Sequence, residues 1–297
     1  MRKAFVVLNP VAGQCDVDVV RQTLEQHFAK TNWTYEVYET TGQERVAEIV
    51  HAALERGFEL FVAAGGDGTV SGVAGGIVHT AVPMGIIPVG TTNALARELD
   101  IPLELDGALS LLMGDHAITN MDAMRIGDQF YFFNIGIGIS ALMMRDTERD
   151  IKRRFGRIAY LWTGLGKLLG LRLRRFTVKV DGQSSRLRAS EVLIVNSGGL
   201  GEPYFHWEPH IHLDDGRLDV FVLRARTAPD YLRVVWGLLL GRQKRDPNVR
   251  FLSAERSIAI NADRPLPVQA DGDVIGQTPI QVQVVPNALQ VIVPATA

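Results

Sequence analysis

The sequence is poor in cysteine and lacks long apolar runs. Its single cysteine, Cys15, cannot form an internal disulfide, so a reducing cytosol is its natural setting. The most apolar stretches, near Leu161–Leu171 and Val234–Gly241, are too short to span a bilayer. The first apolar stretch, Ala4–Leu8, is too short for the core of a signal peptide. We therefore expect a soluble, cytoplasmic protein that reaches the inner membrane surface only as a peripheral protein.

The sequence also lacks a marked excess of charge of either sign. It has 31 lysines and arginines against 33 aspartates and glutamates, a net charge of -2. This balance argues against a general nucleic-acid-binding protein. The length of 297 residues suggests two modest domains. A change of pattern places them at residues 1–120 and 121–297, with the last strand or the tail free to return to the first domain.

Residues 1–120 alternate short apolar strands with amphipathic helices. The expected strands are Ala4–Leu8, Trp33–Glu39, Leu60–Ala64 and Met84–Pro88. The expected helices include Val17–Lys30 and Glu44–Arg56. This order predicts a mostly parallel sheet covered by helices, in which ligands bind at the carboxyl ends of the strands.

Residues 121–297 carry the pattern of an antiparallel β-sandwich-like domain. One expected hairpin joins Met121–Ile126 to Phe130–Ile135, and another joins Phe176–Val180 to Arg186–Asn196. Further expected strands are Leu218–Leu223, Ser257–Ile260, Gln281–Val285 and Leu289–Val293. Helical segments are expected around residues 141–170 and 228–241. The fold class is therefore α/β, with a parallel nucleotide-binding domain followed by this β-domain.

A glycine-rich loop, Ala64–Thr69, follows the third expected strand directly. Its glycines let backbone N–H groups approach a phosphate closely. Asp67 offers a carboxylate to a magnesium ion, and Thr69 offers a hydroxyl to a phosphate oxygen. The alternative is a plain tight turn, which needs fewer of these residues. The sequence has no Gly-Lys-Ser/Thr motif, so this is not the usual P-loop.

A second loop, Pro88–Asn93, follows the next expected strand and precedes a short helix. Asn93 can cap that helix, whose first N–H groups would then face an anion. An ordinary capped loop is the alternative when this motif is taken alone. Two glycine-hydroxyl loops at neighbouring strand ends favour a phosphate site.

These motifs occur in an order that resembles the catalytic domain of diacylglycerol kinase-like lipid kinases, a family that includes sphingosine and ceramide kinases. The resemblance covers nearly the whole chain. It rests on Asn9-Pro10, Gly13, Thr40, the two loops, Ala96-Arg97, Asn134–Gly138, Asp214–Asp219 and Ala270–Asp273.

The resemblance implies transfer of the γ-phosphoryl group of ATP to the hydroxyl of a diacylglycerol- or sphingosine-like lipid, with Mg²⁺ as cofactor. It implies a role in lipid metabolism and phospholipid biosynthesis. Together with the loop chemistry it places Asp273 and Asp67 in catalysis and Asp67 and Asp215 at magnesium. The predicted nucleotide-binding residues are Asn9, Thr40, Gly65, Gly66, Asp67, Gly68, Thr69, Gly90, Thr91 and Asn93.

Three positions depart from the family pattern. The usual Asp-Gly-Glu is Asp271-Gly272-Asp273, a common Asn-Glu pair is Ser71-Gly72, and Ala94 stands where an aspartate is frequent. Two alternatives stay open. One is an NAD kinase-like or phosphofructokinase-like enzyme, because both use a similar Gly-Gly-Asp-Gly loop. The other, suggested by Gly72 and Ala94 in place of acids, is a nucleotide- or lipid-binding regulator that has lost catalysis.

Arg145–Arg175 contains ten basic and three acidic residues with apolar residues between them. A basic amphipathic helix of this kind suits transient contact with an anionic membrane surface. A helix that packs on the β-domain with a solvated basic face is the alternative. We also consider a homodimer and expect no nucleic-acid partner.

Overall fold

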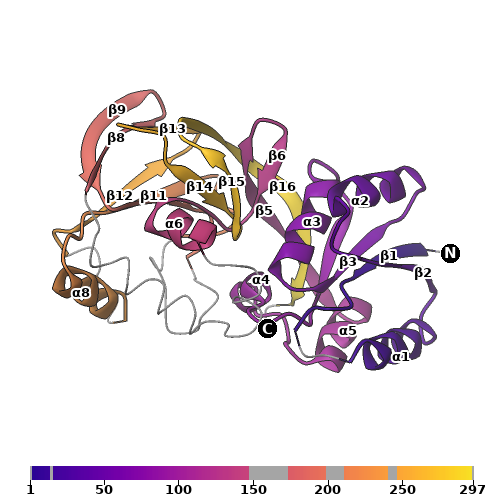
Figure 1. Cartoon of the computed structure of the whole chain (residues 1–297). Coiled ribbons are helices and arrows are strands. Elements are labelled where there is room, and N and C mark those ends of the chain that lie inside the picture. Colours follow the sequence, from indigo (N-terminus) through magenta and orange to yellow (C-terminus); the bar gives the residue numbers. More distant parts are fainter. Residues whose placement is uncertain (1, 14–15, 147–172, 199–210, 240–245, 296–297) are drawn as a thin grey trace. The chain divides into compact units, whose positions relative to one another are not determined.

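The computed structural model describes residues 2–13, 16–146, 173–198, 211–239 and 246–295 (Figure 1). By their contacts, the described residues separate into two units. The first takes in residues 2–123 and 286–295, and the second takes in residues 124–198 and 211–285. The first contains a parallel sheet and the second contains antiparallel sheets, which confirms the predicted fold class.

The first unit is built from parallel strands that alternate with helices. Its strands are β1 (Arg2–Leu8), β2 (Trp33–Glu39), β3 (Leu60–Gly65), β4 (Pro83–Pro88) and the last part of β16 (Ile280–Pro294). Its helices are α1 (Val17–Phe28), α2 (Val46–Glu55), α3 (Asp67–Ile77), α4 (Ala94–Glu98) and α5 (Leu105–Met113). Helix α5 was not predicted.

The strands of the first unit lie in the order β2-β1-β3-β4, and each neighbouring pair is parallel. Gln290 and Val291 of β16 then pair in parallel with β4. The chain passes from β1 to β2 on one side and returns to β3 on the other side of β1. Ligands in such sheets bind outside the carboxyl ends of the strands, at the point where the strand order reverses.

Helices cover both faces of this parallel sheet. Figure 1 shows α1 and α5 on one face and α2 and α3 on the other. Strand β3 is buried along its whole length, which explains its continuous apolar sequence. On one face, Leu24 of α1 and Leu109 of α5 belong to the same buried cluster as Val6 and Val62 of the sheet.

The second unit is an antiparallel sandwich. One sheet contains the last part of β5 (His116–Ile126), β6 (Gln129–Tyr131), β8 (Arg174–Val180), β9 (Gln183–Ala189), β13 (Ser257–Ala262) and the first part of β16. The other runs in the order β12 (Val249–Ala254), β11 (Leu218–Leu223), β10 (Glu191–Val195), β7 (Asn134–Gly138), β14 (Pro267–Ala270) and β15 (Asp273–Gln277). Phe176 and Ile258 of the first sheet share a buried core with Ile137 and Ile194 of the second. The helices described in this unit are α6 (Ile139–Asp146) and α8 (Ala228–Leu239).

The two predicted hairpin turns are confirmed, but two predicted strands were too long. Ile126 pairs with Gln129 across the first turn, and Val180 pairs with Gln183 across the second. The segment Phe130–Ile135 divides between β6 and β7, and Arg186–Asn196 divides between β9 and β10. Each pair belongs to different sheets of the sandwich, so the chain changes sheets where one strand was expected.

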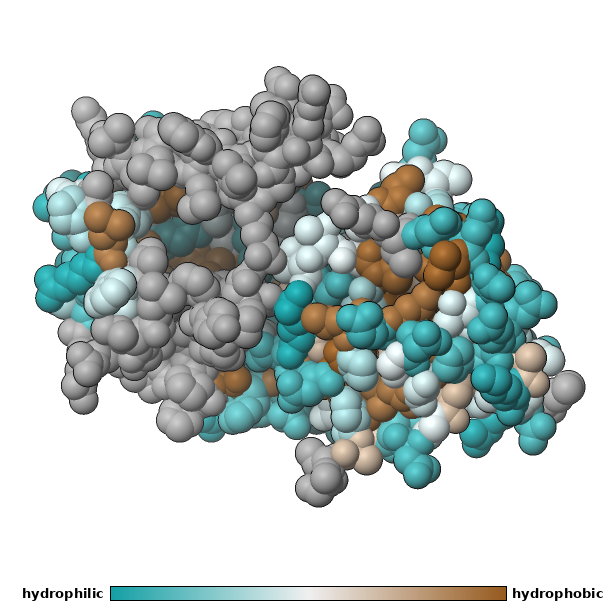
Figure 2. Space-filling view, turned by 90° about the horizontal axis from the view of Figure 1, so that it is seen from below, coloured by the Kyte–Doolittle hydropathy of each residue, from teal (hydrophilic) through white to brown (hydrophobic). Residues whose placement is uncertain are grey.

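Most of the predicted basic helix, residues 147–172, lies outside the described residues. The last two basic residues of that segment, Arg174 and Arg175, begin strand β8 and are not helical. In the part of the chain that the structure describes, no helix is long and apolar enough to cross a membrane. Figure 2 shows a face on which described hydrophilic and hydrophobic side chains are interspersed.

Candidate active site

A cavity of about 350 Å³ lies among the loops at the carboxyl ends of the parallel strands. Its wall comes from four loops, which follow β1, β2, β3 and β4. The lining residues are Asn9, Ala12, Gly13, Thr40, Gly42, Glu44, Val46, Gly66, Gly68, Thr69, Gly90 and Thr91. Seven of the ten predicted nucleotide-binding residues therefore line one cavity. It lies at the carboxyl ends of the strands, where the strand order reverses.

Glycines allow these loops to approach one another backbone to backbone. A Cβ atom at Gly90 would overlap the Cα of Gly66. Gly13 has a φ of 62° and a Cβ there would overlap the carbonyl oxygen of Val89. Only glycine fits both requirements at Gly13, a left-handed backbone and a backbone neighbour in contact. The loops after β1, β3 and β4 are thus held together without side chains between them.

Side-chain hydroxyl and amide groups join the first and third loops. The Asn9 side chain donates a hydrogen bond of 3.4 Å to the hydroxyl of Thr69 and accepts one of 3.1 Å from the backbone of Val11. Thr40 is buried, and its backbone N–H donates to the carbonyl of Leu8 at 2.9 Å. The polar wall is therefore fixed in position by the strands that precede it.

A carboxylate that was not predicted, Glu44, also lines the cavity. It accepts hydrogen bonds of 2.6 Å from both the backbone N–H and the hydroxyl of Thr41, and one of 3.0 Å from the backbone of Gln43. The Thr41 hydroxyl, followed by these N–H groups, lowers the pKa of Glu44 to about 2. The spacing Thr41-x-x-Glu44 resembles that of a capping box, but α2 begins only at Val46, so the pair closes the loop before the helix.

Asp67, and not Asn93, caps helix α4. The Asn93 side chain closes its own loop: its oxygen accepts from Gly90 N–H at 3.0 Å, and its amide donates to the carbonyls of Pro88 and Gly90 at 2.9 Å. It makes no capping bond to α4, so that prediction was wrong. Instead, the Asp67 carboxylate accepts from the backbone N–H of Ala94 at 2.7 Å.

The reason lies in the backbone of Asn93, which has a φ of 51°, in the left-handed region. A residue at the N-cap normally has an extended backbone, from which its side chain reaches the helix. The first N–H groups of α4 therefore face Asp67 and not a bound anion. Burial raises the pKa of Asp67, while its backbone hydrogen bonds, led by that from Ala94, oppose the rise.

Three predicted nucleotide-binding residues do not line the cavity. Asp67 and Asn93 are turned toward backbone groups of the second loop, as just described. Gly65 is buried at the end of β3, where a Cβ atom would overlap the Thr69 side chain. These residues hold the cavity in shape, and the other seven form its surface.

In the second unit, Asp271 organises a tight turn between β14 and β15. Its φ is 47°, and its carboxylate accepts hydrogen bonds from the backbone N–H groups of Phe132, Phe133 and Asn134 at 2.8, 3.0 and 3.1 Å. Asp181 makes the same arrangement at the other Asp-Gly turn, with N–H groups of residues 255–257. Asp271 is thus a structural residue of the turn, and the exposed Asp273 follows it as the first residue of β15.

Polar side chains that the prediction missed surround this turn. Gln269 donates to the Asn134 side chain at 2.7 Å and accepts from Gly272 N–H at 3.2 Å. Burial raises the pKa of Tyr131, and the carboxylates of Asp271 and Asp273 raise it further. Tyr131 therefore lies close enough to both carboxylates to interact with them electrostatically. The only sequence signal for Tyr131 and Gln269 is their position next to the motifs Asn134–Gly138 and Ala270–Asp273.

The glycines of Asn134–Gly138 make room for a buried carboxylate. Glu191 of β10 accepts hydrogen bonds from the hydroxyl of Ser140 at 2.5 Å and from its backbone N–H at 3.1 Å. A Cβ atom at Gly136 would overlap the Ser140 hydroxyl, and one at Gly138 would lie 2.8 Å from a Glu191 oxygen. Burial raises the pKa of Glu191 to about 7.

Asp215 lies in an exposed turn before β11, and its carboxylate accepts from Arg217 N–H at 2.9 Å. Among the described residues there is no group of three or more histidine, cysteine, aspartate or glutamate side chains that could hold a metal ion. The assignments of Asp67 and Asp215 to magnesium remain predictions.

Comparison with known proteins agrees with this arrangement. The model of the diacylglycerol kinase catalytic domain matches residues 3–126, and that of the YegS C-terminal NAD kinase beta sandwich-like domain matches residues 134–293. The chain is 30% identical to a diacylglycerol kinase of Bacillus subtilis, over 94% of this chain and 92% of the relative. It is 26% identical to a diacylglycerol kinase of Staphylococcus haemolyticus, over 94% and 84% of the two chains.

A crystal structure of a diacylglycerol kinase from Bacillus anthracis has the same fold. Its TM-score is 0.78 at 23% identity, with 98% of this chain and 97% of the other covered. Both halves of the chain are thus matched in order, and the resemblance carried by the motifs is confirmed. The chain belongs to the family of bacterial diacylglycerol kinases and related lipid kinases.

Proposed function

We propose that this protein transfers the γ-phosphoryl group of ATP to the hydroxyl group of a lipid, of the diacylglycerol or sphingosine type. The observation that carries the proposal is the cavity in the first unit, where glycine loops and hydroxyl groups from four strand ends meet. Family membership supplies the reaction class. In the step itself, the lipid oxygen forms a bond to the γ-phosphorus, the bond from that phosphorus to the bridging oxygen breaks, and ADP leaves.

The glycine loops are suited to the phosphates of the nucleotide. Gly66 and Gly90 present backbone without side chains to the cavity, so a phosphate can approach the main chain closely. Thr69 and Thr91 add hydroxyl donors. Because most of the catalysis in phosphoryl transfer comes from positioning and charge stabilisation, a rigid cradle of this kind is the main requirement.

The residues present fit a magnesium ion of the kind that kinases use. Such an ion is held mainly by substrate phosphates and water, with one or two carboxylates from the protein. Glu44 lines the cavity and stays ionised, and Asp67 lies in the adjoining glycine loop. When bound, Mg²⁺ neutralises charge that develops on the phosphate oxygens.

Asp273 is our candidate for the base that accepts the proton of the lipid hydroxyl. It is exposed at the start of β15, and the rigid turn made by Asp271 fixes its backbone. Its carboxylate influences the pKa of Tyr131, which places a phenol within electrostatic reach. A general base contributes about two to four orders of magnitude to the rate.

The test measures transfer of radiolabelled phosphate from ATP to a panel of lipids in mixed micelles, with NAD included as an alternative acceptor. Asp273→Ala should lower kcat by about 100-fold or more, whereas Asp273→Glu should retain activity. Asp128→Ala removes an exposed aspartate of the same unit and serves as the matched control. Full turnover by Asp273→Ala would remove that residue as the base. Labelled NAD, or ATP binding without labelled lipid, would favour the alternative functions.

A further inference from the structure

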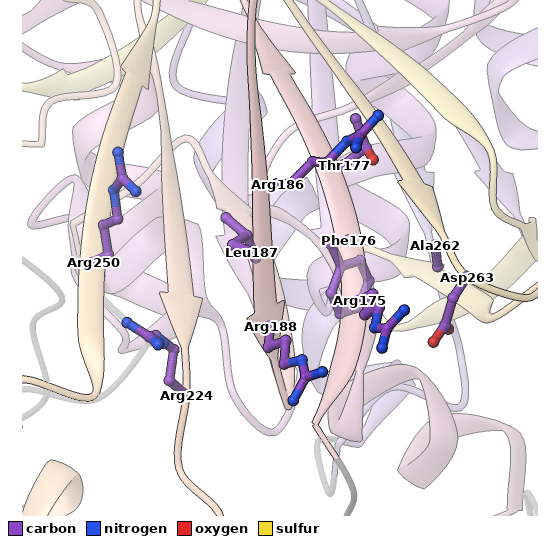
Figure 3. A pocket seen from close by; sticks show the side chains of 10 residues that line it. All are labelled: Arg175, Phe176, Thr177, Arg186, Leu187, Arg188, Arg224, Arg250, Ala262 and Asp263. Atoms are coloured by element: carbon purple, nitrogen blue, oxygen red, sulfur yellow. The ribbon is translucent and has the colours of Figure 1, made fainter.

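The second unit has its own cavity, of about 670 Å³, at the end of the sandwich where β8 and β9 face β11 and β12. Figure 3 shows its wall. The lining residues are Arg175, Phe176, Thr177, Arg186, Leu187, Arg188, Arg224, Arg250, Ala262 and Asp263. Five of these ten side chains are arginines and only one is a carboxylate, so the cavity wall carries a strong positive charge.

Sheet pairing forces two of these arginines together. Arg175 of β8 and Arg188 of β9 are directly opposite in the register, and Figure 3 shows both side chains at the same end of the β8–β9 hairpin. Like charges at directly opposed positions destabilise a sheet. Thr177 and Arg186, two residues further along, form the next pair on the same face. Both side chains are exposed, so solvent weakens their repulsion, and an anion bound between the two guanidinium groups would remove it.

The remaining guanidinium groups come from the other sheet. Arg224 directly follows β11, and Arg250 lies in β12. Within the described part of the chain, none of the five arginines forms an ion pair, although Arg217 and Arg233 of the same unit pair with Glu255 and Asp246 at 2.8 and 3.3 Å.

Apolar residues also line the cavity. Phe176 is buried and Leu187 is partly buried in the core of the sandwich, and Ala262 lies beside them. A lining that contains both guanidinium groups and apolar residues suits a ligand that combines an anionic group with carbon. The planar guanidinium group binds phosphate oxygens in pairs, which an ammonium group cannot do. The volume is in the range of small-molecule sites.

This cavity lies apart from the proposed base. Arg250 is on β12 and Asp273 is on β15, the two edge strands of the same six-stranded sheet. Five strand spacings separate them, which corresponds to about 24 Å. One lipid hydroxyl at Asp273 therefore cannot account for the arginines.

We propose that the arginine cavity is a second ligand site, which binds a phosphate monoester, either free or as the headgroup of an anionic lipid. A phosphate monoester carries close to two negative charges and three acceptor oxygens at neutral pH. Arg175 and Arg188 would hold such a group, and the other three arginines of the wall add positive charge around it.

The experiment uses the full chain and two probes at low salt. Glycerol 1-phosphate is titrated by calorimetry, and vesicles of phosphatidylcholine with and without phosphatidic acid are tested by sedimentation. The variant Arg175→Gln/Arg188→Gln removes the opposed pair. The control Lys179→Gln/Arg256→Gln removes two exposed cations of the same unit that do not line the cavity. Each lost charge-assisted hydrogen bond accounts for roughly tenfold in affinity.

We expect the cavity variant to bind at least one probe about tenfold or more weakly, while the control variant binds as the wild type does. Saturable binding of glycerol 1-phosphate assigns the site to a free phosphate compound. Binding only to phosphatidic acid vesicles assigns it to a lipid headgroup. Equal losses in both variants, or wild-type binding by the cavity variant, would overturn the proposal, as would a wild-type protein that binds neither probe. ATP-dependent lipid phosphorylation is measured separately and does not enter this outcome.

Discussion

Replacing Glu191 by glutamine should remove a pH dependence of stability that the wild-type protein carries. Glu191 is buried in β10, where it accepts two hydrogen bonds from Ser140 at 2.5 and 3.1 Å. Burial disfavours its charged form and raises its pKa from 4.5 to about 7. Glutamine has nearly the same shape and stays neutral, so it imitates the protonated side chain.

The direction of the effect follows from the two pKa values. Between pH 4.5 and about 7, the folded protein holds a proton at Glu191 that the unfolded chain has released. The free energy of unfolding therefore falls as the pH rises through this window. The full difference corresponds to about 3 kcal/mol, because one pKa unit is equivalent to about 1.4 kcal/mol. Relative to wild type, Glu191→Gln should gain about 2–3 kcal/mol between pH 5 and pH 8.

Urea denaturation at several pH values measures this difference, with the transition of the second unit followed by fluorescence. Glu59→Gln removes an exposed glutamate and is the control, for which we expect a pH profile parallel to that of the wild type. If the free energy of unfolding of Glu191→Gln also runs parallel to that of the wild type, the pKa of Glu191 is the same in the folded and unfolded protein and the reasoning fails.

Three further substitutions test how the loops and turns are held. Gly90→Ala should weaken ATP binding at least about tenfold, because the new Cβ would overlap Gly66. Gly68→Ala has open space around its new Cβ and should stay folded. Calorimetric titration with ATP compares the two variants. Asp67→Asn should abolish lipid phosphorylation. It should also cost about 1–3 kcal/mol of stability, because a charged acceptor of backbone N–H groups is lost. A fully active variant with an unchanged melting temperature contradicts this. Asp271→Asn should destabilise the second unit by about 2 kcal/mol, since an amide has one acceptor oxygen for three N–H donors, and urea denaturation measures the loss.

Much of the first unit could be predicted because its central strands β3 and β4 are buried on both faces. Such strands are continuous apolar runs, and the glycine loops that follow them stand out against this background. The order of strands and helices then places the loops at one edge of the sheet. Seven of the predicted residues line one cavity there, as expected for loops at the same edge of a parallel sheet.

The roles of individual polar side chains were harder to predict. Asn93 has the residue type of a helix cap, yet its left-handed backbone turns its side chain into its own loop, and Asp67 caps the helix from 27 residues away. Glu191 and Ser140 meet only because β10 pairs with β7, which leads into α6. Which donor a side chain satisfies depends on contacts that are distant in sequence.

The sequence by itself determined most of the succession of strands and helices in the first unit, the position of the glycine loops and the family. These depend on apolar periodicity and on residues that are adjacent in the chain. Only the tertiary structure decided that Asp67 and Asp271 satisfy backbone groups of other loops, and that Arg175, Arg188 and Arg250 line one cavity. The register between strands brings those side chains together, and register is set by the packing of the whole core, which no short segment of the sequence encodes.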